Sequence, residues 1–305
     1  MSKKVSIVIR CLNENNNLKY LIPKILQQNY KDYEIIFVDS GSTDGTIDTI
    51  NRFIDENDNF NLCHIKKSEF TFGKSLNIGF EKSTGDIIIS LSAHCFPTNN
   101  SWLQSILEPF GITNIGIVFG SQSPHQKTRH SEASVQNTWF NGSSRITDDA
   151  FLNNGNAAYR RVIWEKFKFD EQLTGLEDIE MGIKSLRTGW KIFYSAEAEV
   201  EHLHEENYKT IKNRYRRESE AMKYLDSLNS SDMKIIKNTL FYCFKGFLRG
   251  VKYDIKTTNK STQPNSDIVS ILRYRINQYL GTYKGYKNNM SKNKITDLYF
   301  YPPTT

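Results

Sequence analysis

The sequence predicts an α/β fold in which a mostly parallel sheet is flanked by helices and followed by a C-terminal helical region. Three observations support this prediction. Apolar runs rich in β-branched residues, such as SIVI, EIIFV and DIIIS, have the length of strands. Segments with helical spacing alternate with these runs, and strands covered by helices on both faces are apolar throughout. After residue 205 the apolar residues keep a helical spacing.

Size and composition indicate a folded protein without a membrane-spanning helix. The chain has 305 residues, 38% of them hydrophobic, which suits one large domain with an appendage. Its apolar runs are far shorter than the roughly 18 residues that cross a bilayer, and the start MSKKVSIVI is too short for a secretory signal. A cytosolic location is therefore expected. The widely spaced cysteines are expected to be free thiols: Cys11, Cys63, Cys95 and Cys243.

Charge is distributed unevenly along the chain. Residues 1–204 carry 21 Lys and Arg against 25 Asp and Glu, a net −4, whereas residues 205–305 carry 19 against 9, a net +10. A cationic region of this kind favours anionic lipid, nucleic acid or a phosphorylated substrate as its partner. The alternative is a solvated basic surface.

The first elements form a βαβ unit. Residues 5–9 are a β-branched strand, residues 18–28 place apolar side chains at helical spacing, and residues 33–39 are a second strand. Residues 41–56 follow as a helix, with Ser42 or Asp44 as the expected N-cap. The alternation continues through a segment at 61–66, a helix at 75–83 and a strand at 85–93. About 100 residues thus resemble a nucleotide-binding half-domain.

Ligands of such sheets bind at the carboxyl ends of the strands, where the loops diverge. Asp39 ends an apolar strand, so it is placed to accept hydrogen bonds from a base N–H or a ribose hydroxyl. The alternative role for Asp39 is helix capping. The loops that define the candidate donor site are 10–14, 39–46, 73–77 and 93–97.

The chain resembles the inverting glycosyltransferases of family 2, which have a GT-A fold. Five ordered blocks over residues 4–206 carry the resemblance: VSIVIRCLNEN, IIFVDSGSTDGT, FGKSLNIGFEKSTGDIIISLSAHCFPTNNSWL, NGNAAYRRVIWEKFKFDE and GLEDIEMGIKSLRTGWKIFYSAEAEVEHLH. The resemblance implies a catalytic domain at 1–206. Its residues 1–100 would bind a nucleotide-diphosphate sugar, expected to be UDP-linked, and its residues 101–206 would hold the acceptor. Residues 207–305 would form the helical region.

The same resemblance implies roles for single residues of the donor site. Asp39 matches the nucleotide-base contact, and Arg10, Asn13 and Glu14 match the loop around the base and ribose. Lys74 lies in the block that approaches the diphosphate and donor sugar, where its charge would neutralise phosphate. A solvent-facing lysine is the alternative. The complete set of expected donor-binding residues is Arg10, Asn13, Glu14, Asp39, Ser42, Lys74, Asn77 and His94.

One departure from the family pattern concerns the metal. Most members follow the strand GDIIISLS with an acidic motif that holds Mg2+ or Mn2+, but this chain has Ala93-His94-Cys95. Hard cations prefer oxygen ligands, so a divalent metal is uncertain. Three interpretations are open: His94 is a single metal ligand, His94 contacts the diphosphate directly, or the site works without metal. Cys95 is expected to pack as a small apolar residue.

The adjacent carboxylates Glu177 and Asp178 are the catalytic candidates. Inverting transfer needs a base that takes a proton from the acceptor hydroxyl. Apolar residues at helical spacing follow the pair, so both carboxylates stand at a helix amino terminus, where the helix dipole stabilises negative charge. By the family pattern Asp178 is the base and Glu177 orients an acceptor hydroxyl. Simple helix capping is the alternative.

Two histidines follow the last strand. Alternate residues of an extended segment point the same way, so His202 and His204 are expected to face one site as metal or diphosphate contacts. Neutral core or loop histidines are the alternative. A zinc site of His202, His204, His94 and Cys95 lacks the spacing of structural zinc motifs.

The polar segment 118–149 shows no strong strand pattern and is expected to be a lid or acceptor loop. Trp139 has a physical rationale because sugar rings stack on aromatic faces, although core packing is an equal alternative. The acceptor-side candidates are Gln122, His125, Arg129, Trp139 and Arg160.

The C-terminal helices have a basic amphipathic pattern. Phe244 and Leu248 alternate with Lys245, Arg249 and Lys252, as in helices that lie at the headgroup level of an anionic membrane. A helical bundle packed on protein is the competing interpretation. Nucleic-acid binding is disfavoured because no recognition motif is present.

The sequence therefore predicts a glycosyltransferase of bacterial surface-polysaccharide (capsule or O-antigen) biosynthesis, peripheral at the inner face of the cell membrane, with a glycan or lipid-linked acceptor. The alternative is a catalytically inactive nucleotide- or glycan-binding protein of the same fold, suggested by the missing acidic motif. A nucleotidyltransferase would need a Gly-rich basic signature near the first strand, which RCLNENNN lacks.

Overall fold

The computed structural model describes residues 4–228 and 240–287. The chain forms two compact units, each built from separate stretches of sequence. The first unit comprises residues 1–123, 140–171 and 177–202, and the second comprises residues 124–139, 172–176 and 203–305. The expected functional division at residue 206 stays a prediction.

The elements alternate between strand and helix until residue 202. The strands are β1 (Val5–Cys11), β2 (Tyr33–Asp39), β3 (Phe60–His64), β4 (Ile87–Ser92), β5 (Cys95–Pro97), β6 (Ile115–Pro124), β7 (Arg145–Thr147), β8 (Asn156–Arg160) and β9 (Lys191–His202). The α-helices are α1 (Asn15–Leu26), α2 (Thr46–Asp55), α3 (Phe72–Lys82), α4 (Trp102–Leu107), α5 (His130–Trp139), α6 (Arg161–Phe167), α7 (Glu177–Arg187), α8 (Tyr208–Leu228), α9 (Leu240–Thr257) and α10 (Ile268–Lys287). Short 3-10 turns lie at Lys67–Glu69, Glu108–Gly111 and Thr258–Lys260.

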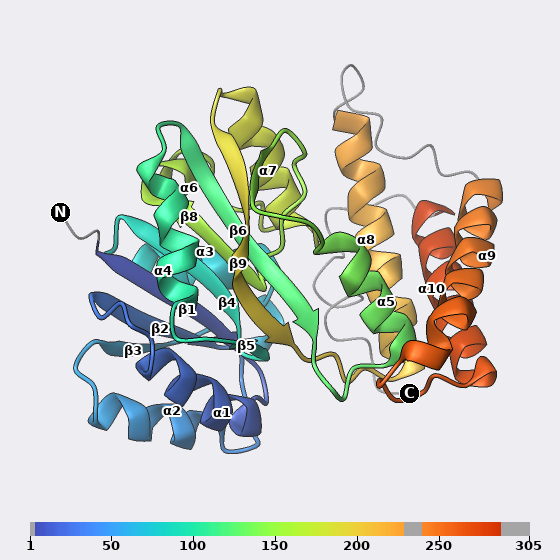
Figure 1. Cartoon of the computed structure of the whole chain (residues 1–305). Coiled ribbons are helices and arrows are strands. Elements are labelled where there is room, and N and C mark those ends of the chain that lie inside the picture. Colours follow the sequence, from blue (N-terminus) through green and yellow to red (C-terminus); the bar gives the residue numbers. More distant parts are fainter. Residues whose placement is uncertain (1–3, 229–239, 288–305) are drawn as a thin grey trace. The chain divides into compact units, whose positions relative to one another are not determined.

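The described strands form one nine-stranded sheet in the order β3-β2-β1-β4-β8-β6-β9-β5, with β7 paired to β9 (Figure 1). The neighbours β3, β2, β1 and β4 run parallel. Antiparallel pairing begins where β8 joins β4 and continues between β8 and β6. The predicted α/β class is confirmed, and the parallel part of this mixed sheet is the part that the apolar runs predicted.

Successive side chains of each strand point to opposite faces of the sheet, and both faces are covered. Val8 of β1 and Tyr159 of β8 pack in one cluster with Phe80 of α3 and further side chains of α6 and α7. The strand residues next to these in sequence point to the opposite face of the sheet. There the indole Nε1 of Trp102 on α4 donates a hydrogen bond to Asn156 Oδ1 at 3.1 Å. The core therefore lies on both sides of the strands, as helix-covered sheets require.

Three sequence predictions need correction. The N-cap of α2 is Gly45, at φ 90, rather than Ser42 or Asp44, although Asp44 Oδ1 accepts from the Thr46 N–H at 3.0 Å. Helix α3 begins at Phe72, so Lys74 lies in its first turn and not in a loop. The segment 118–149 is not one long loop, because it contains the end of β6, the helix α5 and β7.

Other expectations are partly met. Cys11, Cys63 and Cys95 are free thiols, as predicted, and the side chain of Cys243 lies outside the described residues. Helices α8, α9 and α10 lie within the predicted C-terminal helical region, of which 229–239 and 288–305 are outside the described residues. Of the helices that the structure describes, none is both long and apolar enough to span a bilayer.

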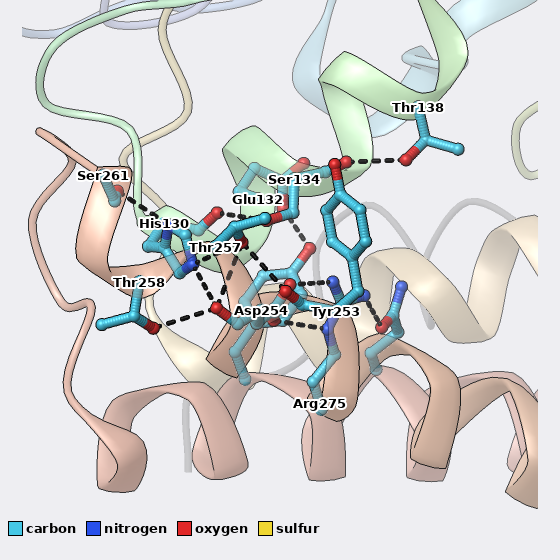
Figure 2. Close-up of polar contacts among 12 residues, drawn as sticks. His130, Glu132, Ser134, Thr138, Tyr253, Asp254, Thr257, Thr258, Ser261 and Arg275 are labelled. Carbon is cyan, nitrogen blue, oxygen red and sulfur yellow. Dashed lines mark hydrogen bonds and ion pairs between the residues drawn. The ribbon is translucent and has the colours of Figure 1, made fainter.

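Helix α5 joins the second unit through buried polar contacts (Figure 2). His130 Nε2 lies 3.0 Å from the backbone oxygen of Asp254 and Nδ1 lies 2.7 Å from Ser261 Oγ. Because a carbonyl only accepts, Nε2 carries the proton and Nδ1 accepts from the hydroxyl. The Asp254 carboxylate in turn accepts two hydrogen bonds from Arg275, at 2.8 and 2.7 Å. These contacts join α5, α9 and α10.

A second buried pair ties α5 to α8. Glu132 is 4% exposed and accepts from Arg214 Nη2 at 2.6 Å and from the Tyr274 hydroxyl. The Arg214 charge lowers the pKa of Glu132 against the opposing effect of burial. Removing one member of such a pair leaves an uncompensated buried charge, which is strongly destabilising.

Helices α8 and α10 approach closely at two glycines. A Cβ atom at Gly281 would lie 2.3 Å from the Lys212 carbonyl oxygen, and one at Gly285 would lie 2.3 Å from the Arg216 carbonyl oxygen. Both obstacles are backbone atoms, so they cannot rotate away. By contrast, a Cβ at Gly246 of α9 would meet nothing within 4 Å.

Gly285→Ala is expected to destabilise the protein by about 1–3 kcal/mol, because the added methyl group forces α10 away from α8. Gly246→Ala is the matched control, and we expect it to stabilise by about 0.5–1 kcal/mol, since alanine favours the helix. Thermal unfolding followed by circular dichroism measures both. Equal melting temperatures for the two variants would contradict the close helix contact.

Candidate active site

Hydrogen bonds connect the loops at the carboxyl ends of β1 and β2. The backbone N–H of Asn13 donates to Ser42 Oγ at 2.8 Å, and Asn13 Oδ1 accepts from the Thr43 N–H at 2.8 Å. Asn13 has φ 57, a left-handed conformation that asparagine tolerates better than most residues. The Glu14 N–H donates to Thr46 Oγ1 at 2.8 Å. The structure thus brings together the predicted donor-site residues of both loops.

Asp39 shapes the second of these loops. Its carboxylate is 1% exposed, and Oδ2 accepts from the backbone N–H groups of Gly41 and Ser42 at 2.8 and 3.1 Å. The side chain therefore turns the chain directly after β2, a role that differs from capping α2. His64 Nδ1 lies 3.9 Å from the same oxygen.

Glu14 reaches across to the loop after β4, where His94 stands in place of the acidic motif. His94 Nδ1 lies 2.9 Å from Glu14 Oε1, and the His94 ring stacks on His202 with centroids 5.3 Å apart and 18° between the planes. His202 Nδ1 lies 2.7 Å from Gln122 Oε1. Since both partners are oxygen acceptors, each Nδ1 carries its proton. The ends of β1, β4, β6 and β9 therefore share one polar cluster.

This cluster does not make up a metal site by itself. Mg2+ and Mn2+ prefer oxygen ligands, and the cluster offers one carboxylate, which already accepts from His94. Burial raises the pKa of the Cys95 thiol well above its usual range, so Cys95 offers no thiolate. Within residues 4–228 and 240–287, no group of three or more His, Cys, Asp and Glu side chains is placed to hold a metal ion.

Asn154 holds the two predicted catalytic carboxylates. Its backbone N–H donates to Asp178 Oδ2 at 3.0 Å and its Nδ2 donates to Glu177 Oε1 at 3.1 Å. Its Oδ1 accepts from the Tyr159 hydroxyl at 2.6 Å, and its backbone oxygen accepts from Ser90 Oγ at 2.7 Å. Asn154 is 3% exposed and uses both its backbone and its side chain to fix the pair.

Helix α7 begins at the carboxylate pair, as predicted. Asp178 Oδ1 accepts from the Ile179 N–H at 2.8 Å, so the free amides of the first turn help to bind the charge. Gly182 allows α7 to pack closely, because a Cβ there would lie 2.5 Å from the Ala150 carbonyl oxygen. Close packing of the helix fixes the position of its first turn.

The electrostatics favour a carboxyl group that titrates near neutral pH. Asp178 is 9% exposed, and burial together with the neighbouring Glu177 charge raises its pKa to about 7. The backbone donors and the charge of Arg10 act in the opposite direction. Arg10 Nη1 lies 4.0 Å from Glu177 Oε1, and its guanidinium lies 5.1 Å from the centre of the Phe72 ring. Arg10 was expected beside the base and ribose, and the structure places it beside the carboxylates instead.

Two other donor-site candidates have structural partners. Lys74 Nζ pairs with Glu69 Oε2 at 3.1 Å at the start of α3. Asn77 Nδ2 donates to the Phe169 carbonyl oxygen at 3.0 Å, and its Oδ1 accepts from the Trp164 indole at 3.0 Å. Because the Asn77 amide joins α3 to the chain around α6, this arrangement favours a structural role over a donor contact.

Within the first unit, the acceptor-side candidates Gln122 and Arg160 are not brought together. Arg160 pairs in register with Ile87 at the start of β4, which is the end of the strand opposite the site. There its guanidinium donates to the carbonyl oxygens of Ile115 and Phe110 at 2.6 and 2.7 Å, so Arg160 has a structural role. Gln122 lies in the histidine cluster at the site end of β6.

The remaining candidates belong to the second unit: His125, Arg129, Trp139 and His204. Trp139 is 53% exposed, which excludes the core-packing alternative. Strand β9 ends at His202, so the alternation that was to place both histidines on one side does not continue to His204. His204 Nδ1 lies 3.9 Å from Glu206 Oε2.

Sequence reasoning missed Asn154 and Tyr159. The only signal for Asn154 is its place in NNGNAAYRR, directly before a strand, a pattern that matched the family without indicating a role. Its partners are 23 and 24 residues away, and one of its contacts to them is made by the backbone.

Comparison with known proteins gives relatives over most of the chain. The O-antigen chain rhamnosyltransferase RfbN of Salmonella typhimurium is 26% identical over 213 residues, which are 66% of this chain and 67% of that protein. The O-antigen chain rhamnosyltransferase WbaN of Salmonella anatum is 28% identical over 190 residues, 58% of this chain and 59% of that protein. The chain thus spans about two thirds or less of these relatives.

Solved structures share the fold. The mannosyltransferase PcManGT of Pyrobaculum calidifontis, solved in complex with GDP-Man and Mn2+, superposes with a TM-score of 0.62 over 93% of this chain and 88% of that one, at 14% identity. The family model described as Glycosyl transferase family 2 matches residues 6–171, more than half of the chain and the part that holds the donor-site loops. With this match and the glycosyltransferase fold, the chain belongs to glycosyltransferase family 2.

Proposed function

We propose that this glycosyltransferase moves a sugar, with inversion, from a nucleotide-diphosphate donor to a glycan or lipid-linked acceptor in surface-polysaccharide biosynthesis. The observation that carries the proposal is the buried pair Glu177 and Asp178, fixed by Asn154 beside the ends of the parallel strands. The O-antigen rhamnosyltransferases among the relatives support a surface glycan as the acceptor.

Asp178 acts as the general base. At neutral pH its carboxylate takes the proton of the acceptor hydroxyl as that oxygen attacks the anomeric carbon, and the nucleoside diphosphate leaves from the opposite face of the sugar. The hydrogen bonds from the Asn154 and Ile179 N–H groups keep the carboxylate in one orientation. A pKa of about 7 keeps it basic enough to accept the proton and partly ionised at neutral pH.

The donor lies over the loops after β1, β2 and β4, with Asp39 at the base and His94 and His202 at the diphosphate. The neighbour solved with GDP-Man and Mn2+ supports a nucleotide-sugar donor. Because the described residues offer a single carboxylate, Glu14, in the cluster of His94 and His202, we assign no step to a metal, and addition or removal of Mn2+ is part of the test.

A catalytically inactive binding protein is the second candidate, favoured only by Ala93-His94-Cys95 in place of the acidic motif. The intact geometry around Asp178 weighs against it. A binding protein has no need of two buried like charges, each of which costs free energy unless it is paired.

Release of nucleotide from sugar donors tests the proposal. The protein is incubated with donors that carry uridine, guanosine or thymidine bases, including a rhamnose donor, with Mn2+ or with EDTA. We expect release from at least one donor and a loss of about 10²–10⁴-fold in Asp178→Asn, which removes the base. Tight nucleotide binding without release from any donor would favour the binding protein.

The pH dependence of the same reaction tests the raised pKa. The base works as the carboxylate, so the rate should fall roughly tenfold for each pH unit below 7 and be level above it. A carboxyl group of ordinary pKa would leave the rate flat from pH 5 to 9. Imidazoles titrate in the same range, so His94→Gln is measured in parallel. We expect the fall in rate below pH 7, the acid limb of the pH–rate profile, to remain in His94→Gln and to disappear in Asp178→Asn.

We also propose that α9 attaches the protein to anionic lipid at the inner face of the cell membrane. Phe244, Leu248 and Ile255 are 48, 51 and 45% exposed. At about 100° per residue they form one stripe along the helix. A basic stripe runs beside it, made of Lys245, Arg249, Lys252 and Lys256, all exposed. Apolar and basic stripes side by side fit the headgroup region of an anionic membrane.

Cosedimentation with vesicles tests this attachment. We expect binding to vesicles that contain phosphatidylglycerol, little binding to pure phosphatidylcholine, and weakening by salt. Leu248→Glu should reduce binding at least about fivefold, because it places a charge in the apolar stripe. Tyr253→Glu, about 140° around the same helix and equally exposed at 49%, is the control. Equal loss in both variants would contradict a role of the stripe.

A further inference from the structure

Arg10 presents a buried N–H group to which no described residue offers a hydrogen-bond acceptor. Among the described residues, Nη1 of Arg10 is buried and has no hydrogen-bond partner. Leaving such a donor unpaired is unfavourable, and a charged guanidinium prefers acceptors strongly. The position is therefore suited to an acceptor that arrives with a ligand.

The guanidinium is held in place by its surroundings. Arg10 is the penultimate residue of β1, in register with Val38 of β2 and Ser92 of β4. Its guanidinium lies over the Phe72 ring, 5.1 Å from the centroid, a contact that restricts its movement. A donor fixed in this way binds a ligand without first losing much side-chain freedom.

The nearest acceptor is too far for a direct hydrogen bond but suits a bridge. Nη1 lies 4.0 Å from Glu177 Oε1. By distance, an oxygen atom about 2.8 Å from each of these atoms would bridge them, with an angle near 90° at that oxygen. Glu177 Oε1 accepts from Asn154 Nδ2, and a carboxylate oxygen has a second lone pair for another donor.

A hydroxyl group matches both ends of this gap, because it accepts from N–H through its lone pairs and donates through its own hydrogen. A phosphate oxygen would satisfy Arg10 but would be repelled by Glu177. The chemistry of the gap therefore selects a sugar hydroxyl over the diphosphate.

We propose that Arg10 and Glu177 together bind one hydroxyl of the donor sugar, with Arg10 Nη1 donating to it and Glu177 Oε1 accepting from it. Arg10 extends from β1, whose loop belongs to the donor site, and Glu177 adjoins the base Asp178. The sugar ring would thus be held between its leaving group and the base. The inference rests on the proposed function, and it assigns Arg10 to the sugar instead of the base and ribose.

The pair also affects the base. The Arg10 charge lowers the pKa of Asp178, against burial and the Glu177 charge that raise it. A variant that removes the charge should therefore move the acid limb of the pH–rate profile to higher pH, whereas a purely structural residue would not shift it.

Binding of UDP and of UDP-linked sugars to Arg10→Met and Arg10→Lys tests the proposal without any need for turnover. For the donor that binds wild type best, we expect the Kd to rise at least about tenfold in Arg10→Met, while the Kd of UDP alone stays within about twofold. Arg10→Lys keeps the charge but loses the fork geometry, so it should retain the position of the acid limb and still bind the sugar donor more weakly. GDP and dTDP with their sugars are treated in the same way if UDP does not bind.

Arg187→Met, which changes an exposed arginine in the last turn of α7, is the control and should leave every constant unchanged. Equal weakening of UDP and of the UDP-sugar by Arg10→Met would overturn the proposal, and so would weakening of neither. Donors that bind but never release nucleotide would count against the proposed function alone. Melting temperatures of the variants separate loss of binding from loss of folding.

Discussion

The arrangement of the active site depends on how two adjacent carboxylates are kept buried. Two negative charges side by side, largely removed from water, are unstable unless hydrogen bonds and opposite charge compensate them. Asn154 supplies most of the compensation, with its backbone to Asp178 and its side chain to Glu177. Arg10 supplies a positive charge nearby without forming a direct hydrogen bond. Incomplete compensation is what leaves Asp178 with a raised pKa and hence with basicity at neutral pH.

Buried polar groups serve a different purpose in the second unit. Arg275 and Asp254 form a bidentate pair, and Arg214 pairs with Glu132, with each charge matched by a partner. Such pairs add little net stability compared with apolar packing, but they penalise any arrangement that separates the partners. These two hydrogen-bonded pairs contrast with Arg10, whose Nη1 has no hydrogen-bond partner among the described residues.

Much of the fold could be predicted from the sequence. Strands β1, β2 and β4 are buried on both faces. Each therefore appears in the sequence as a continuous apolar run, which a short window of sequence is enough to recognise. Helix α5 was missed because its buried face is polar. His130, Glu132 and Gln136 replace the apolar stripe by which helices are recognised. The partners of His130 and Glu132 are more than 80 positions away in sequence, which no local pattern reveals.

The residues of the candidate site also include some that the sequence could predict and some that it could not. Glu177 and Asp178 were predicted because the chemistry needs a base and the helix that carries them has a clear period. Asn77 and Arg160 were given ligand roles because polar side chains near a site look alike in sequence, and their hydrogen bonds to distant backbone and indole groups appear only in the fold. The place of Arg10 depends on the direction of a side chain at a strand end, and the family pattern does not specify it.

The composition of the second unit has a consequence for dissecting the molecule. Because residues 124–139 belong to it, a polypeptide that stops at residue 206 would keep α5 but lose α8, α9 and α10. Glu132 would then lack Arg214 and Tyr274, and His130 would lack Asp254 and Ser261. A catalytic fragment obtained by simple truncation would expose these orphaned groups, so both units must be expressed on one continuous chain.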